Sequence, residues 1–140
     1  MILLDTNVVS ELMRPAPSPH VLQWLNIQAS QDIWLCTVVA AELLFGIARL
    51  PDGTRKQQLT LTFSLMLSED FQNRVLAFDL EAAVVYADLV ARRESQGKPI
   101  SLADAQIASI CLTHQASLAT RNTKDFEGLG LRLVNPWLVP

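Results

Sequence analysis

Short apolar runs alternate along the chain with longer stretches in which apolar residues recur at the spacing of a helix. Short buried strands separated by helices are typical of a parallel sheet with helices on both faces. The pattern therefore predicts an α/β fold. The predicted strands are the apolar runs at residues 2–4, 33–36, 75–78, 117–119 and 131–134.

Between these runs, the sequence predicts helices whose ends are marked by capping and helix-breaking residues. Thr37, Asp79 and Ser101 stand where a side-chain oxygen can cap a helix N-terminus. Pro51-Asp52-Gly53 and Gln96-Gly97-Lys98-Pro99 end two of the helices. The predicted helices cover residues 7–13, 19–28, 38–50, 54–68, 80–95 and 102–114. The third and fourth of these are placed to form a helical hairpin.

Composition agrees with a folded domain. The chain has 140 residues, of which 50% are hydrophobic and 18% charged, and we expect a single domain over residues 1–140. No apolar stretch approaches the roughly 20 residues of a membrane span, and the N-terminus lacks the basic region of a signal peptide. Cys36 and Cys111 lie in apolar runs without a CxxC spacing. We therefore expect a cytoplasmic protein with two buried free thiols.

Acidic and amide side chains follow successive predicted strands. Asp5 comes directly after the first strand, and Glu42 lies on the helix after the second. Asp104 follows the third strand after one intervening helix, and Asn122 and Asp125 follow the fourth. Because the carboxyl ends of parallel strands share one edge of a sheet, we expect these side chains to meet there.

Carboxylates that meet at one edge repel each other, so they need either protons or a cation. Oxygen ligands of this kind favour Mg²⁺ or Mn²⁺, and a cation held in this way suits hydrolysis of a phosphodiester. The formal net charge of −3 is unusual for a protein that binds nucleic acid, which commonly shows a basic patch. A bound metal would supply positive charge where the side chains do not.

Four segments, in this order and at these distances, resemble the PIN domain: LLDTNVVSEL, VVAAELLFGIARL, ISLADAQIAS and LATRNTKDF. They are also similar to the toxin subunits of VapBC-type toxin–antitoxin pairs, including the FitB-like branch. The resemblance covers nearly the whole chain. It implies a PIN-like fold, with a parallel sheet in the strand order 3-2-1-4-5 and helices on both faces.

The resemblance also implies site residues. It makes Asp5, Glu42 and Asp104 the core acids of a ribonuclease site that binds Mg²⁺ or Mn²⁺. Thr6 matches the hydroxyl residue beside the first acid, and Thr120 matches a polar residue near the site.

The match loosens at the fourth acid. Many relatives have Asp where this chain has Asn122, which can coordinate through its carbonyl oxygen but brings no charge. Asp125, three residues later, could supply the charge instead, and the sequence leaves open which of the two completes the site. A weakened fourth ligand favours one well-held metal ion over two.

Each acid also has an ordinary structural interpretation. Asp5 and Asp125 could be turn residues, and Asp79 is best interpreted as a helix cap. Ser101 and Asp104 form the Ser-x-x-Asp pattern of a capping box, in which an acid suits the helix N-terminus. The joint placement of the acids, rather than any one of them, favours the metal site.

The predicted hairpin carries more apolar surface than two helices can hide between them, so these residues are either core or a partner surface. The resemblance implies a homodimer and a small cognate antitoxin at this surface, with operator DNA bound only through the antitoxin. The apolar residues are Leu43, Phe45, Ile47, Leu50, Leu59, Phe63 and Leu67.

The sequence thus favours a metal-dependent endoribonuclease that hydrolyses RNA phosphodiester bonds as the toxin of a type II toxin–antitoxin system. The main alternative is a non-catalytic PIN-fold module that serves only complex formation, which Asn122 leaves open. Other doubly wound phosphotransfer proteins fit poorly. A receiver domain needs a Lys after its fifth strand, and an aspartate-nucleophile phosphatase needs a second Asp where this chain has Asn7.

Overall fold

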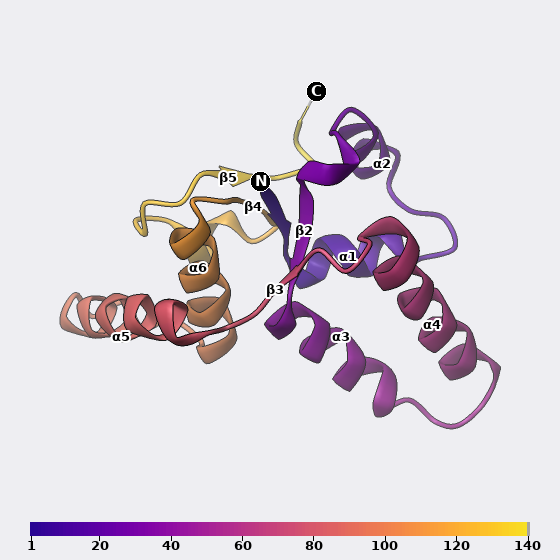
Figure 1. Ribbon diagram of the computed structural model, residues 1–140, viewed down its shortest axis with the longest axis horizontal. Coiled ribbons are helices and arrows are strands. Elements are labelled where there is room, and N and C mark those ends of the chain that lie inside the picture. Colours follow the sequence, from indigo (N-terminus) through magenta and orange to yellow (C-terminus); the bar gives the residue numbers. More distant parts are fainter. Residues whose placement is uncertain (140) are drawn as a thin grey trace.

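In the computed structural model, which describes residues 1–139, five strands form one sheet in the order β3-β2-β1-β4-β5 (Figure 1). All four neighbouring pairs are parallel. The predicted α/β fold and strand order are therefore confirmed. The strands are β1 (Ile2–Leu4), β2 (Ile33–Cys36), β3 (Val75–Leu76), β4 (Ser117–Ala119) and β5 (Leu133–Val134).

Helices cover both faces of this sheet. Figure 1 shows α5 and α6 on one side of the β1–β2 pair and the first four helices on the other. They are α1 (Thr6–Leu12), α2 (Pro19–Asn26), α3 (Thr37–Ala48), α4 (Thr54–Leu65), α5 (Leu80–Ser95) and α6 (Leu102–His114). Shorter turns are η1 (Ser30–Asp32), the π-helical η2 (Met66–Asp70) and η3 (Thr123–Phe126).

The two edge strands are shorter than predicted. β3 ends at Leu76 rather than at residue 78, and β5 begins at Leu133 rather than at residue 131. An edge strand has only one neighbour, so its length is set by how many backbone groups that neighbour offers. Beyond β3, the backbone N–H of Phe78 turns away from β2 and donates to Thr37 Oγ1 at 3.3 Å.

Two of the three predicted helix caps are present. Asp79 Oδ1 accepts from the Ala82 N–H at 3.0 Å, and Ser101 Oγ accepts from the Asp104 N–H at 3.2 Å. The predicted cap at Thr37 is wrong, because Thr37 is itself the first residue of α3. Its hydroxyl instead fixes the connection between β3 and α5.

The core lies on both faces of the central strands. Leu3, Leu35 and Leu118 from neighbouring strands are fully buried, as are the two free cysteines. The expectation of two buried free thiols is confirmed, and burial raises the pKa of the Cys36 thiol to about 11. No helix within residues 1–139 combines the length and the apolar character that crossing a bilayer requires.

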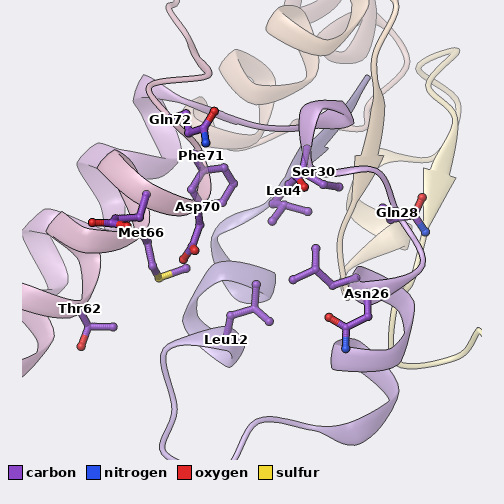
Figure 2. A pocket seen from close by; sticks show the side chains of 13 residues that line it. Leu4, Leu12, Asn26, Gln28, Ser30, Thr62, Met66, Asp70, Phe71 and Gln72 are labelled. Atoms are coloured by element: carbon purple, nitrogen blue, oxygen red, sulfur yellow. The ribbon is translucent and has the colours of Figure 1, made fainter.

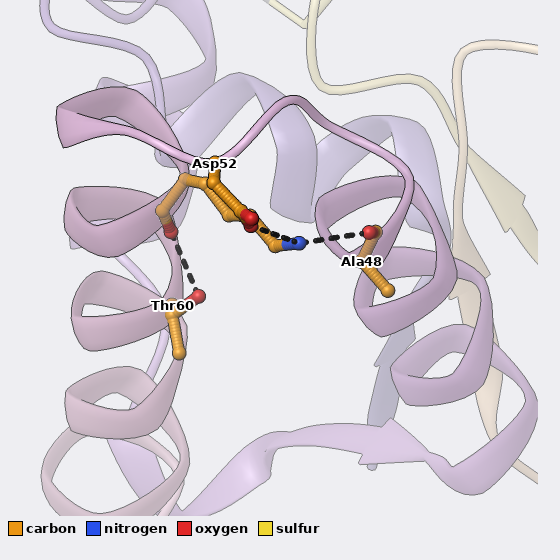
Figure 3. A network of polar contacts seen from close by, with 4 residues as sticks. Ala48, Asp52 and Thr60 are labelled. Carbon is orange, nitrogen blue, oxygen red and sulfur yellow. Dashed lines mark hydrogen bonds and ion pairs between the residues drawn. The ribbon is translucent and has the colours of Figure 1, made fainter.

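Helices α3 and α4 form the predicted hairpin. At its turn, Lys56 Nζ donates to the Ala48 carbonyl oxygen at 3.0 Å and lies 3.3 Å from Asp52 Oδ1 (Figure 3). Thr60 Oγ1 donates to the Lys56 carbonyl oxygen at 2.7 Å one turn later. Lys56 thus ties the end of α3 to the start of α4.

The apolar residues of the hairpin divide between the core and the surface. Leu43, Ile47 and Phe63 are buried, whereas the Phe45 side chain is 65% exposed. Other large apolar side chains of the two helices are also exposed, so the hairpin contributes to the core and also leaves apolar side chains uncovered. The exposed ones are Leu44, Phe45, Leu61 and Leu65.

Candidate functional site

Asp5 is a buried carboxylate at the carboxyl end of the central strand. It follows β1 directly, and its backbone N–H donates to the Ala119 carbonyl oxygen at 2.9 Å, which continues the pairing with β4. Its residue surface is only 5% exposed. Asp5 also caps α1, because its Oδ1 accepts from the Thr6 N–H at 2.8 Å. The change from strand to helix therefore places this carboxylate at the sheet edge.

Thr120 holds the other oxygen of Asp5. Its Oγ1 donates to Asp5 Oδ2 at 2.7 Å, and the Thr120 side chain is fully buried just after β4. The same hydroxyl oxygen accepts from the Asn122 N–H at 3.1 Å. The predicted position of Thr120 near the site is thus a direct contact with Asp5.

Asn7 is a site residue that the sequence did not single out. Its Nδ2 lies 3.4 Å from both Asp5 Oδ2 and Thr120 Oγ1, and its Oδ1 accepts from the Arg121 N–H at 3.1 Å. The signal that could have revealed it is its place as the third residue of Asp-Thr-Asn, on the first turn of a helix that begins at the sheet edge.

Glu42 reaches the same edge from α3. Thr6 Oγ1 donates to Glu42 Oε1 at 2.7 Å, so the hydroxyl beside the first acid links α1 to α3. Glu42 is an exposed residue on α3, next to the buried Leu43. Its carboxylate is therefore open to solvent and held by one short hydrogen bond.

Burial and neighbouring charge act together on Asp5. Burial raises the pKa of its carboxyl group above the ordinary value, and hydrogen bonds from Thr120 and Thr6 lower it. The negative charge of Glu42 raises the pKa again, while Asn7 lowers it, and the net direction is upward. The ionised form of Asp5 is therefore held in place but is costly without a nearby cation.

Asp104 is half-buried in the first turn of α6. Burial raises the pKa of its carboxyl group, Ser101 lowers it, and the charges of Asp5, Asp125 and Glu42 raise it further. The capping function at this helix belongs to the Ser101 hydroxyl. These three acids are therefore near enough to act electrostatically on Asp104.

The acids share one edge without forming a closed cage. Asn122 and Asp125 are exposed at the start of and within η3, and the Asp125 N–H donates to the Asn122 carbonyl oxygen at 3.1 Å. Within residues 1–139, no group of three His, Cys, Asp or Glu side chains is close enough to hold a metal ion. Whether Asn122 or Asp125 completes a metal site therefore stays a prediction. His20 and His114 form no cluster with cysteine in the same range.

A cavity of about 640 Å³ lies elsewhere, between the segment before β2 and the end of α4 (Figure 2). Figure 2 shows Leu4 and Leu12 in its wall, with Asn26 on one side and Met66 and Asp70 on the other. Its lining contains none of the acids of the sheet edge. The charged edge and the cavity are thus separate features of the surface.

Comparison with known proteins agrees with this architecture. The PIN domain family matches residues 2–130. The plasmid stability protein StbB of Pseudomonas syringae pv. tomato is 44% identical over 137 residues, which are 98% of this chain and 99% of the relative. The VapC ribonuclease Y4jK of Sinorhizobium fredii is 41% identical over 137 residues, or 98% of each chain.

A solved structure is similar over the full length. The chain superimposes on a chain of the FitAB complex bound to the IR36 DNA fragment with a TM-score of 0.91 and 36% identity, covering 100% of this chain and 98% of that one. With its sheet order, its acidic edge and these full-length relatives, the chain belongs to the PIN domain family and is similar over nearly its whole length to toxins of the VapC and FitB type.

Proposed function

We propose that this chain is a Mg²⁺- or Mn²⁺-dependent endoribonuclease and the toxin of a type II toxin–antitoxin pair. The observation that carries the proposal is the buried Asp5 carboxylate. Hydrogen bonds hold both of its oxygens, and burial and the charge of Glu42 raise its pKa. Three groups hydrogen-bond to this one carboxylate, although burial and a neighbouring negative charge disfavour its ionised form. This arrangement favours a role in binding an ion over a role as an ordinary turn residue.

The donor set fits a hard divalent cation. Asp5, Glu42 and Asp104 would hold it with carboxylate oxygens, and Asn122 or Asp125 would complete the set. Thr6 and Thr120 orient Glu42 and Asp5 through bonds of 2.7 Å each. When bound, such an ion polarises a phosphoryl oxygen and lowers the pKa of a bound water.

The side chains have defined tasks in this proposal. Thr120 keeps Asp5 Oδ2 fixed, so that the carboxylate does not reorient as charge develops at the edge. Burial and the charges of Asp5, Asp125 and Glu42 raise the pKa of the Asp104 carboxyl group, which favours binding of a cation or a proton there. Glu42 is exposed and can reach toward Asp5 from α3 when a cation offsets their repulsion.

The partners follow from the relatives. Solved relatives include FitAB and VapBC complexes of toxin with antitoxin, some of them bound to DNA. We infer a small cognate antitoxin for this chain, an arginine of which would suit the acidic edge, and operator DNA bound only through it. The exposed apolar side chains Leu44, Phe45, Leu61 and Leu65 favour a homodimer. We propose the cytoplasm as its location.

The proposal is tested by cleavage of total bacterial RNA by the purified protein, with Mg²⁺, with Mn²⁺ and with EDTA. Asp5→Asn and Asp104→Asn should each reduce the rate by about 100-fold or more, since several kcal/mol of transition-state stabilisation depend on the ion. Asp52→Asn is the matched control, because that side chain is fully exposed at the hairpin turn (Figure 3). Full activity of Asp104→Asn would show that the assigned site is wrong.

A second candidate, a non-catalytic interaction module, is favoured by one observation: no three acids within residues 1–139 stand ready to share an ion. Isothermal titration with Mn²⁺ separates the two candidates. A saturable site that is lost in Asp5→Asn supports the nuclease, whereas the absence of saturable binding supports the module.

A further inference from the structure

Arg121 lies at the same sheet edge as Asp5. It follows β4 by two residues, and its guanidinium carbon lies 4.8 Å from the centre of the Trp137 ring. Trp137 follows β5 and packs on the core. A cation within about 6 Å of an indole centre is attracted by the ring electrons. This cation–π contact therefore orients the exposed side chain of Arg121 at this edge of the sheet.

The backbone of Arg121 is fixed on both sides. Its N–H donates to Asn7 Oδ1 at 3.1 Å, and its carbonyl oxygen accepts from Asn135 Nδ2 at 3.4 Å. Asn7 also lies 3.4 Å from Asp5 Oδ2, and Thr120, the preceding residue, donates to the same oxygen. The position of Arg121 is therefore coupled to the position of the buried carboxylate.

Within residues 1–139, the donors of the Arg121 guanidinium are free. Arg121 belongs to none of the ion pairs within residues 1–139, and its side-chain nitrogens donate no hydrogen bond there. Arg74 and Arg132, by contrast, donate to backbone carbonyl oxygens. An arginine that is held on an indole ring and has no acidic partner keeps its planar set of donors for another anion.

We propose that Arg121, held by its contact with the Trp137 ring, binds a backbone phosphate of the nucleic acid. This contact would lie at the edge of the sheet that also carries Asp5. A guanidinium matches two phosphate oxygens with parallel N–H groups. The acidic edge repels phosphate, and the chain carries a net charge of −3, so a cation placed at the edge offsets that repulsion locally. This inference rests on the proposed ribonuclease function for the identity of the polyanion as RNA.

The test is equilibrium binding of a labelled, mixed-sequence single-stranded RNA, followed by fluorescence anisotropy at several salt concentrations. EDTA is present, so that no cleavage occurs. Each phosphate contact that is lost reduces the slope of log affinity against log salt by about 0.7. Arg121→Gln should weaken binding and reduce the slope by about that amount. Trp137→Leu keeps the charge of Arg121 but removes the indole ring that holds its guanidinium. This variant should weaken binding with a smaller change of slope.

Arg132→Gln is the matched control, because Arg132 precedes β5 and so stands at the opposite edge of the sheet. It should leave both affinity and slope unchanged. Arg121→Lys, which retains a charge and disturbs the fold least, should keep the slope and bind more weakly, because lysine lacks the planar fork. Thermal unfolding of each variant verifies that it is folded.

Equal slopes for Arg121→Gln and Arg132→Gln would overturn the inference. So would an Arg121→Gln protein that binds RNA normally but no longer binds its protein partner, since Arg121 would then belong to a protein interface. Because the assay contains EDTA, it gives a result whether or not the protein cleaves RNA. The phosphate contact and the nuclease activity can therefore fail separately.

Discussion

The Thr120 hydroxyl and the Asp5 carboxylate are 115 residues apart in the chain, yet Oγ1 of one donates to Oδ2 of the other at 2.7 Å. The contact exists because β4 and β1 are parallel neighbours, with Leu4 opposite Ala119, so the residues that follow the two strands emerge side by side. Pairing of the central strands thus sets the position of the buried acid.

Replacing Thr120 with valine should shift the pH dependence of RNA cleavage. The hydroxyl hydrogen bond lowers the pKa of Asp5, so its loss raises that pKa further. In the proposed site Asp5 would bind the cation in its ionised form. The acidic limb of the profile should therefore move to higher pH, and the maximal rate should fall by about 10- to 100-fold.

Thr120→Ser, which keeps the hydroxyl, is the control for the lost methyl packing. It should retain the pH profile of the unmodified protein. A Thr120→Val protein with an unshifted acidic limb would contradict the role assigned to this hydrogen bond.

In the absence of divalent metal at pH 7, the Asp104→Asn variant should have a larger free energy of unfolding than the unmodified protein. Burial first, and then the charges of Asp5, Asp125 and Glu42, raise the pKa of Asp104, although the hydrogen bond with Ser101 lowers it. An acid whose pKa is higher in the folded state binds more protons there. Stability therefore falls as the pH rises from the unfolded-state pKa, about 3.9, through the folded-state pKa.

Urea unfolding in EDTA across this pH range is the measurement. The two proteins should converge below about pH 4, where the carboxyl group is protonated in both folded and unfolded states. Saturating Mn²⁺ should stabilise the unmodified protein, by about 2.7 kcal/mol at 100 times Kd, and stabilise Asp104→Asn less. If Asp104→Asn is less stable than the unmodified protein in EDTA at pH 7, the ionised Asp104 carboxylate does not destabilise the metal-free fold, and the prediction is wrong.

Asn7→Ala should reduce RNA cleavage by about 10- to 100-fold, the usual cost of losing a residue that orients a ligand. The change removes the acceptor of the Arg121 N–H and two donors near Asp5 and Thr120. Asn26→Ala, at the exposed end of α2, is the control and should retain the full rate. Equal cleavage rates for the two variants would show that Asn7 does not orient the site.

Glu11→Ala should lower the free energy of unfolding by about 1.5–3 kcal/mol, the typical worth of a hydrogen bond to a charged group. Glu11 is only 7% exposed, and its Oε2 accepts from the Ser18 N–H at 3.0 Å, which fixes the loop between α1 and α2. Arg14→Ala should cost much less, because the ion pair of Arg14 with Glu11 is largely exposed on the arginine side. Equilibrium urea unfolding of the two variants checks the order.

The sequence was sufficient for the elements that depend on periodicity and on capping chemistry. Apolar runs and helical spacing predicted the three inner strands with their bounds, and Asp79 and Ser101 cap the helices as expected. The ends of the edge strands and the role of Thr37 were missed, because they depend on which backbone groups a neighbouring segment leaves unpaired. Which backbone groups remain unpaired is known only from the tertiary structure.

The site was predictable only in part. Parallel strands bring Asp5 and Asp104 to one end of the sheet, and the charges of Asp5 and Glu42 raise the pKa of Asp104. Within residues 1–139 no three acids are close enough to hold an ion, so the metal site stays a prediction. The contact of Glu42 with Thr6 depends on how α3 packs against α1, and the role of Asn7 depends on the path of the chain after β4. Neither leaves a periodic signal in the sequence.

The dispersal of the acidic edge along the chain has a consequence for biosynthesis. Thr120, which fixes Asp5, is translated 115 residues after it, and β4 must emerge before β1 gains its second neighbour. A partly made polypeptide on the ribosome therefore lacks an organised edge until nearly the whole domain has left the exit tunnel. We therefore expect the nascent chain to leave the messenger RNA and the ribosome uncut until synthesis of the domain is almost finished.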